Sequence, residues 1–260
     1  QKVVDHYTYV LATDGDLQEP VALGAAAIAG HLGLKKLVVY YDANDAQISG
    51  TVSRSDSVDY ATVFDGLGWN VQTIDGHDHS AMHFAIETAK VMDKPSIIIG
   101  NTIMAKGSAN MEKDHNTHGA PLPQDEIDLT KEKLGLPDKK FYVPAEVIEH
   151  FRTRHADLTK EAEKWSVRFG QLSKDSNFKN IIENTIGEKM VSVLKMPDFD
   201  SGETLATRKA FGAVLDSIAD SLPQLVGGSA DLEPSNYTGN YAKKFGDFTK
   251  DNHSGRNIPF

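Results

Sequence analysis

Between residues 7 and 101, short apolar runs rich in β-branched residues alternate with stretches that have helical periodicity. Parallel strands need a crossover connection, which is usually a helix that returns in a right-handed sense. The alternation therefore predicts an α/β fold with a doubly wound parallel sheet. We expect strands at Tyr7–Ala12, Leu37–Tyr41, Asn70–Ile74 and Ser96–Asn101, and helices at Glu19–Leu32, Tyr60–Leu67 and Ser80–Val91.

Polar residues stand at the carboxyl ends of these expected strands. Asp14-Gly15-Asp16 follows the first strand, Asn44 follows the second and Thr102–Met104 follows the last. Ligands of open parallel sheets bind at this edge. One carboxylate, one amide and a main-chain carbonyl suit Mg²⁺ or Ca²⁺ that also binds phosphate oxygens. Gly15 would let the backbone approach the anion, and a helix starting near Gln18 would direct its free N–H groups at it.

Two of these features leave alternatives open when the residues are taken alone. An Asp-Gly-Asp tripeptide also forms ordinary Asx turns, so a metal–phosphate site and a structural turn are both consistent with it. The first helix is made of small apolar residues from Ala22 to Gly30. Such a helix suits the centre of a core, and it equally suits a domain or subunit contact.

The pattern changes after residue 120. Residues 121–202 are charged and helical with no strand signal, which is typical of a connector. An amphipathic helix is expected at Thr204–Leu222, ended by Pro223 and followed by the short apolar run Leu225–Gly227 and a glycine-rich turn. We therefore divide the chain into an α/β phosphate-binding domain at residues 1–135, a helical connector at 136–202 and the start of a second α/β domain at 203–260.

Composition narrows the possible classes of protein. The chain has 27 basic and 37 acidic side chains and a net charge of −10, which argues against nucleic acid or an anionic membrane as its main partner. It has no cysteine, and no apolar stretch approaches the length of a spanning helix. We expect a cytoplasmic protein. Because Gln1 and Phe260 adjoin apolar segments rather than loose polar ends, we also expect an internal part of a longer protein.

Six motifs resemble the transketolase family, in the family's order and close to its spacing. They are DGDLQE at Asp14–Glu19, AGHL at Ala29–Leu32, YDAN at Tyr41–Asn44, HGAPL at His118–Leu122, ATRK at Ala206–Lys209 and GGSADLEPSN at Gly227–Asn236. The resemblance implies thiamine diphosphate with Mg²⁺ or Ca²⁺, and a homodimer with its sites at the subunit interface. It also implies reversible transfer of a two-carbon ketol unit between sugar phosphates, as in the pentose phosphate pathway. Residues 1–135 would then be the diphosphate-binding domain and residues 203–260 the start of the pyrimidine-binding domain.

The same resemblance implies roles for five residues around the cofactor. Asp14 and Asn44 would bind the metal ion by their side chains, and Ala46 by its carbonyl oxygen. Gly15 would contact the diphosphate. Glu19 corresponds to the family's glutamate near the subunit contact that links the two cofactors.

In the later motifs, the resemblance implies that His118 contacts both the diphosphate and the substrate, where an imidazole suits proton transfer. Arg208 and Ser235 would bind the sugar phosphate, and Asp231 would help to hold the cofactor from the neighbouring subunit. Without the resemblance, His118 is interpreted as a surface residue, Arg208 as a solvated or salt-bridged helix residue and Ser235 as a helix cap.

The chain departs from the family pattern at several points. Thr13 replaces the first glycine of Gly-Asp-Gly, which narrows the backbone freedom before the metal-binding acid. Gly24 stands where a second interface glutamate is common, so the carboxylate link between the cofactors is in question. The loop between Ser108 and His118 is about one residue longer than in familiar members.

Three alternatives to transketolase stay open at this point. Two are related enzymes, dihydroxyacetone synthase and deoxyxylulose-phosphate synthase, and the third is a non-catalytic remnant that keeps the metal turn for structure. The set of His118, Arg208 and Ser235 favours transketolase. The family's catalytic glutamate and early histidines fall outside residues 1–260, so we expect this stretch alone to lack turnover.

Overall fold

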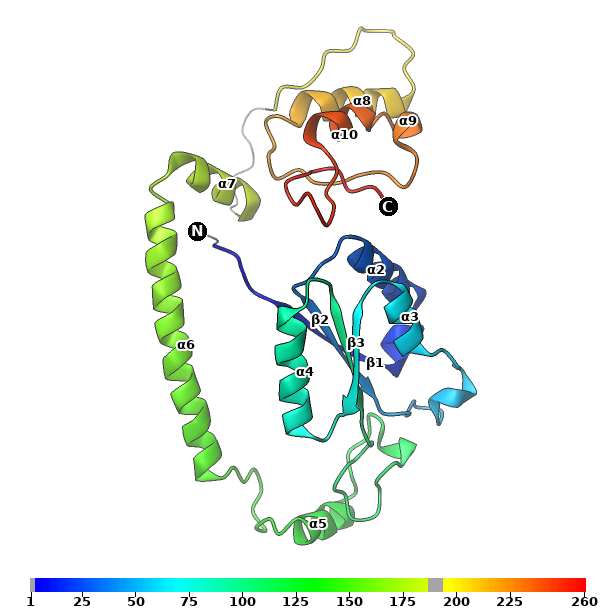
Figure 1. Cartoon of the computed structure of the whole chain (residues 1–260), viewed down its shortest axis with the longest axis vertical. Coiled ribbons are helices and arrows are strands. Elements are labelled where there is room, and N and C mark those ends of the chain that lie inside the picture. The colour runs from blue at the N-terminus through cyan, green and yellow to red at the C-terminus, as the bar shows by residue number, and fades with distance from the viewer. Residues whose placement is uncertain (1–2, 187–193) are drawn as a thin grey trace. The chain divides into compact units, whose positions relative to one another are not determined.

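A computed structural model describes residues 3–186 and 194–260 of the chain. These residues form two compact units, one of residues 5–148 and one of residues 149–260 together with Val3 and Val4 (Figure 1). Among the described residues, no helix has both the length and the apolar character needed to cross a membrane.

The first unit is built on a sheet of four parallel strands, which confirms the predicted α/β class. The strands are β1 (Thr8–Thr13), β2 (Leu37–Ala43), β3 (Asn70–Asp75) and β4 (Ser96–Asn101). Their order in the sheet is β1-β2-β4-β3. All three pairings are parallel, and Thr13 at the end of β1 lies opposite Asp42 of β2. The carboxyl ends of the strands therefore meet at one edge.

Helices cover both faces of this sheet, because alternate strand residues point to opposite sides. One face packs Val39, Tyr41, Ile97 and Ile99 against α1 (Asp14–Gln18), α2 (Pro20–His31) and α3 (Tyr60–Gly66). The other face packs Val38 and Ile98 against α4 (His79–Val91). Figure 1 shows α4 on one side of the strands and α2 and α3 on the other. The result is a three-layer domain whose core lies on both faces of the sheet.

The segment after β1 differs from its prediction. We expected a turn at residues 14–16 and a helix from near Gln18, but α1 begins at Asp14 itself. The Asp16 carboxylate accepts hydrogen bonds from the Thr13 backbone N–H and hydroxyl, which caps this short helix. Glu19 then leaves the helical conformation because it precedes Pro20, so α2 starts one residue later than expected.

Thr13 introduces no backbone strain at this turn. Its φ of −120° and ψ of 177° are ordinary extended values that any residue adopts. The departure from the family's glycine is therefore tolerated, and the threonine hydroxyl contributes a hydrogen bond to the helix cap instead.

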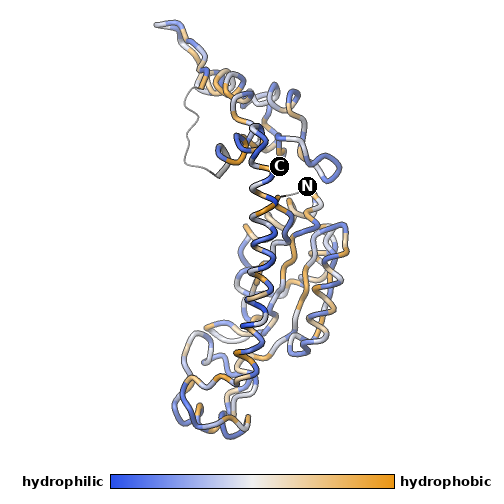
Figure 2. The backbone as a smooth tube through the Cα atoms, turned by 90° about the vertical axis from the view of Figure 1, so that its left-hand side faces the viewer, coloured by the Kyte–Doolittle hydropathy of each residue, from blue (hydrophilic) through white to orange (hydrophobic). Residues whose placement is uncertain are grey.

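Irregular segments connect the sheet to the rest of the first unit. They include the 3-10 turns η1 (Val52–Arg54) and η2 (His115–Thr117), followed by the helix α5 (Gln124–Lys133). The long helix α6 (Ala145–Leu172) carries mainly hydrophilic residues with isolated hydrophobic ones, as Figure 2 shows.

The second unit contains most of α6 and the helices that follow it. These are α7 (Ser176–Ile186), α8 (Thr207–Ile218), α9 (Glu233–Asn236) and α10 (Gly239–Phe245). The guanidinium of Arg256 lies 3.9 Å from the centre of the Phe245 ring and donates to the carbonyl oxygens of Ala219 and Leu222 after α8. An isolated parallel bridge joins Gly227 to Asn257. The domain boundaries at residues 135 and 202 stay predictions.

Candidate functional site

Asp14 and Asn44 come from the crossover segments that follow two adjacent parallel strands. Because Thr13 pairs with Asp42, both segments leave the sheet at the same edge. The backbone N–H of Asn44 is close enough to the Asp14 carboxylate to offset part of the rise that burial causes in its pKa. The two residues predicted to share a metal ion are thus neighbours in the fold.

The Asp14 carboxylate is buried and only partly satisfied. Its residue is 4% exposed, and its Oδ1 accepts a hydrogen bond of 2.5 Å from the Tyr41 hydroxyl. Oδ2 is also buried, and it has no hydrogen-bond partner among the described residues. Burial raises the pKa of Asp14, and the charges of Asp42 and Asp45 add to this rise. A buried, unpaired carboxylate oxygen beside two further acids is a place where a cation lowers the electrostatic energy.

Asn44 lies in an Asx turn, the structure that we considered for Asp14–Asp16. Its Oδ1 accepts a hydrogen bond of 2.9 Å from the backbone N–H of Ala46, and its Nδ2 donates to Asp42 at 3.4 Å. Asp45, between them, has a φ of 54°, which turns the chain sharply and brings Ala46 inward to 7% exposure. An amide oxygen has a second lone pair, so the turn leaves Asn44 able to bind a metal ion.

The donor set at this edge is mixed rather than acidic. Among the described residues, no group of three or more His, Asp or Glu side chains is placed to hold a metal ion. A site here depends on one carboxylate, an amide oxygen and a backbone carbonyl, which is the set expected for Mg²⁺ or Ca²⁺ bound to a phosphorylated ligand.

A cleft of about 870 Å³ adjoins the same edge of the sheet. Its polar lining residues include Thr13, Asp42, Asn44, His77 and Thr102, and Tyr40 and Ile98 of the sheet also line it. The Thr102 hydroxyl donates to Asp42, and the backbone N–H of Ile103 donates to Nε2 of His77 at 2.8 Å. The segment after β4 is therefore held against the end of β2 and the segment after β3.

Sequence reasoning missed Tyr41 and His77. We assigned no role to His77, yet it lies in the segment after β3 and its ring holds Ile103 at the cleft. The rule that ligands bind at the carboxyl ends of parallel strands was a signal for it. Tyr41 had no such signal, because its role arises from packing against Asp14, 27 residues earlier.

The other predicted residues of the first unit are exposed. Gly15 is helical, and a Cβ built on it would meet no atom within 4 Å, so its backbone is open to an approaching ligand. Glu19 is exposed at the N-terminal end of α2. His118 is exposed directly after η2, and it is not among the described residues that line the cleft.

In the second unit, Arg208 opens onto a smaller hollow of about 450 Å³ that Gly228 and Asn236 also line. No ion pair involves Arg208 within the described residues, which sets aside its interpretation as a salt-bridged residue. Ser235 lies inside α9 rather than at its cap, which is Leu232, so the interpretation of Ser235 as a helix cap is wrong. Asp231 is exposed with a φ of 51°.

Comparison with known proteins identifies the group to which this arrangement belongs. The family model described as "Transketolase, thiamine diphosphate binding domain" matches residues 1–189. The chain belongs to the transketolase family. The resemblance inferred from the six motifs is therefore confirmed.

Curated relatives and solved structures agree with this assignment. Transketolases of Bacillus subtilis and Geobacillus stearothermophilus are 36% and 37% identical to the chain over 272 and 268 residues. These matches cover 99% and 100% of the chain, and the chain spans 39% and 40% of the length of those relatives.

Among solved structures, transketolase from Leishmania mexicana matches with a TM-score of 0.91 at 32% identity, over 99% of this chain and 39% of that one. A transketolase from Pichia stipitis, in complex with sedoheptulose-7-phosphate, matches with a TM-score of 0.90 at 32% identity, over 99% of this chain and 40% of that one.

Removing the Tyr41 hydroxyl tests whether its hydrogen bond orients the Asp14 carboxylate for binding a metal ion. In Tyr41→Phe, the buried carboxylate loses its side-chain donor, so Mg²⁺-dependent affinity for thiamine diphosphate in the complete protein should fall about 10-fold or more. Titration followed by calorimetry measures this affinity. The matched control is Tyr60→Phe, whose hydroxyl binds Asp56 and not Asp14, and which should keep its affinity within about twofold. Equal losses in both variants would contradict the role of Tyr41.

Proposed function

We propose that the complete protein is a transketolase that moves a two-carbon ketol unit reversibly from a ketose phosphate to an aldose phosphate. The observation that carries the proposal is the match of residues 1–189 to the family's thiamine diphosphate-binding domain. The buried Oδ2 of Asp14 at the sheet edge, which has no hydrogen-bond partner among the described residues, supports it independently. The activity is proposed for the complete protein, since the chain spans about two fifths of the length of its curated relatives.

Thiamine diphosphate and a divalent ion are the proposed cofactors. The side chains of Asp14 and Asn44 and the carbonyl oxygen of Ala46 would hold Mg²⁺ or Ca²⁺, and the open backbone at Gly15 would face the diphosphate. When bound, thiamine diphosphate supplies the electron sink that the transfer of a ketol unit requires. The protein's own residues then bind the metal diphosphate, orient the sugar and hold the protons that move.

Sugar phosphates are the proposed substrates. Arg208 would bind the phosphate, because its planar guanidinium matches two phosphate oxygens and it makes no ion pair within the described residues. Ser235 would donate a hydrogen bond to the same group. His118 is proposed to donate to the diphosphate or substrate and to move a proton, which suits an imidazole near neutral pH.

A homodimer is the proposed assembly, with Glu19 and Asp231 near the contact between subunits. The helix α2 supports this choice, because it buries Ala26 and Ala29 but leaves Val21 77% and Ile28 43% exposed. An apolar helix face of this kind is typical of a protein interface. Residues 1–135 and 203–260 are proposed as parts of the diphosphate-binding and pyrimidine-binding domains.

The proposed location is the cytoplasm, and the absence of cysteine from the sequence fits it. The proposed role of the enzyme is in the pentose phosphate pathway.

Cofactor titration and a substrate assay test the proposed function together. The complete protein should bind thiamine diphosphate only when Mg²⁺ or Ca²⁺ is present, and titrating each ion separately ranks the two. It should then transfer a ketol unit to ribose 5-phosphate. Binding without transfer to this acceptor would favour a related thiamine enzyme. Failure to bind the cofactor with either ion would favour a non-catalytic remnant.

A further inference from the structure

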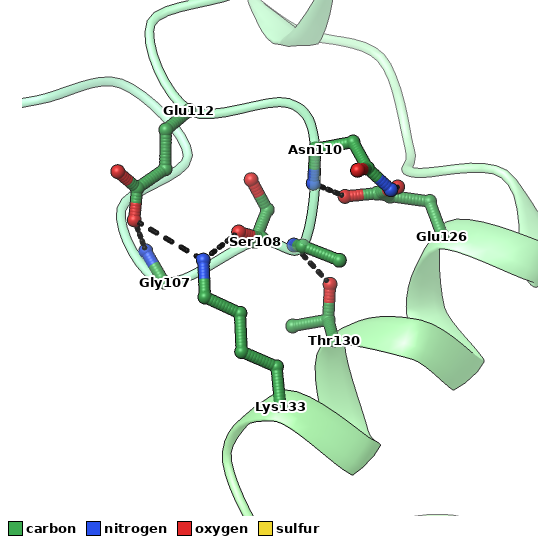
Figure 3. A network of polar contacts seen from close by, with 8 residues as sticks. Gly107, Ser108, Asn110, Glu112, Glu126, Thr130 and Lys133 are labelled. Atoms are coloured by element: carbon green, nitrogen blue, oxygen red, sulfur yellow. Dashed lines mark hydrogen bonds and ion pairs between the residues drawn. The ribbon is translucent and has the colours of Figure 1, made fainter.

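The loop that carries His118 is attached to α5 along one face of the helix. The loop runs from Thr102, after β4, to His118, before α5. Figure 3 shows Glu126, Thr130 and Lys133 directed from α5 toward the loop. These residues are four and three positions apart, a spacing that places side chains on the same side of a helix.

Each of the three side chains holds a main-chain group of the loop. The Glu126 carboxylate accepts hydrogen bonds from the backbone N–H of Asn110 at 2.7 Å and from its side-chain amide at 3.0 Å. Thr130 Oγ1 accepts from the backbone N–H of Ala109 at 3.0 Å, and Lys133 Nζ donates to the carbonyl oxygen of Ser108 at 2.6 Å. Three consecutive loop residues are thus tied to one helix.

Glu126 is the least exposed of these helix residues. It is 6% exposed, in contrast to an ordinary first-turn glutamate in solvent. The two hydrogen bonds from Asn110 lower the pKa of Glu126, so the carboxylate is charged at neutral pH. Hydrogen bonds with a charged partner are stronger than neutral ones, and Glu126 accepts two of them, whereas Lys133 donates one and the bond to Thr130 is neutral.

The Glu126–Asn110 pair closes a ring of chain that contains the predicted catalytic histidine. The two residues are 16 positions apart, and His115 and His118 lie between them. Within the ring, the backbone N–H of Lys113 donates to the carbonyl oxygen of Met104 at 2.9 Å, and Met104 lines the cleft. The ring is therefore fixed to α5 at one point and to the cleft wall at another.

We propose that Glu126 is a positioning residue, which orders the segment 104–118 and thereby sets the place of His118 for the reaction. Glu126 is not among the described residues that line the cleft, so its proposed effect on the reaction is transmitted through Asn110. The proposal rests on the proposed function, since the reaction that His118 serves is itself proposed. The anchoring of the loop is a separate physical claim and has its own measurement.

The experiment compares three variants of the complete protein by hydrogen–deuterium exchange without cofactor and by steady-state kinetics. Glu126→Ala should raise amide exchange across residues 104–118 about 10-fold, with the strands unchanged, and lower kcat/KM about 10-fold through loss of positioning. Glu126→Gln should keep most of the wild-type protection from exchange and most of the wild-type kcat/KM, because the Asn110 amide can flip and accept from the new NH₂ group. Glu132→Ala, at an exposed residue of the same helix outside the network, should match the wild type.

Unchanged exchange and kinetics in Glu126→Ala would overturn the proposal, and so would a Glu126→Gln variant as impaired as Glu126→Ala with an intact fold. Faster exchange throughout residues 5–148 would mean that Glu126 only stabilises the unit, which also overturns the positioning role. A wild-type protein without ketol transfer would overturn the proposed function and the catalytic part of this proposal. In that case, exchange in the variants still decides whether Glu126 anchors the loop.

Discussion

In Asp14→Asn, the complete protein should bind thiamine diphosphate with Mg²⁺ about 100-fold more weakly than the wild type, or not at all. Changes at residues that merely support a metal ligand cost 10 to 100-fold in affinity, so losing the only carboxylate of the proposed set should cost at least that much. Asparagine keeps the shape of the side chain and can still accept the Tyr41 hydrogen bond. The loss would therefore report the missing charge rather than a collapsed site.

The same substitution should stabilise the metal-free chain. Oδ2 of Asp14 is buried without a partner among the described residues, and burial is the largest cause of its raised pKa. Removing this charge should raise the free energy of unfolding in EDTA by about 1 kcal/mol at neutral pH. Urea unfolding of the 260-residue chain measures this gain.

The sign of the pH dependence follows from the raised pKa of Asp14. A carboxyl whose pKa is higher in the folded state than 3.8, its ordinary value, begins to destabilise the fold as pH rises above 3.8, and the penalty is complete above the folded-state pKa. The advantage of Asp14→Asn should therefore be complete above that pKa and should shrink as pH falls toward 3.8. An advantage that grows on acidification would contradict the assigned cause.

Asp65→Asn is the matched control for both measurements. Asp65 is exposed on α3 in the same unit, so removing its charge should alter neither cofactor affinity nor the free energy of unfolding by more than about 0.5 kcal/mol. If Asp14→Asn bound the metal diphosphate as tightly as this control, Asp14 would not be a metal ligand.

Gly30→Ala should strongly destabilise the first unit. A Cβ on Gly30 would lie 1.9 Å from the carbonyl oxygen of Leu67 and 3.3 Å from the Trp69 ring. The first of these atoms belongs to the backbone, and Trp69 is 1% exposed, so neither can yield without moving the core. We expect a loss of about 3 kcal/mol in the free energy of unfolding.

Gly24→Ala on the same helix is the matched control and should raise the free energy of unfolding instead of lowering it. A Cβ on Gly24 meets no atom within 4 Å, and the position lies inside α2. Alanine has the higher helix propensity, so the variant should gain up to about 1 kcal/mol. Urea unfolding followed by circular dichroism compares the pair. Equal free energies for the two variants would show that α2 does not pack against the turn before β3.

Much of the fold could be predicted because it depends on local patterns. Apolar runs such as Ser96–Asn101, rich in β-branched residues, are typical of strands that helices cover on both faces. The start of α1 could not be predicted, since Asp14-Gly15-Asp16 suits a turn and a helix start equally. The hydrogen bonds between Thr13 and Asp16 decide for the helix.

The sequence by itself determined the parallel α/β class and, through its motifs, the transketolase family with Asp14 and Asn44 at the ends of two strands. Only the tertiary structure decided which side chains hold Asp14 and the residues 103 and 110, which follow the last strand. The Tyr41 hydroxyl on Asp14, the His77 ring on Ile103 and the Glu126 carboxylate on Asn110 join residues that are 27, 26 and 16 positions apart. A strand or helix leaves its mark in the periodicity of neighbouring residues, whereas a partner brought close by packing leaves none.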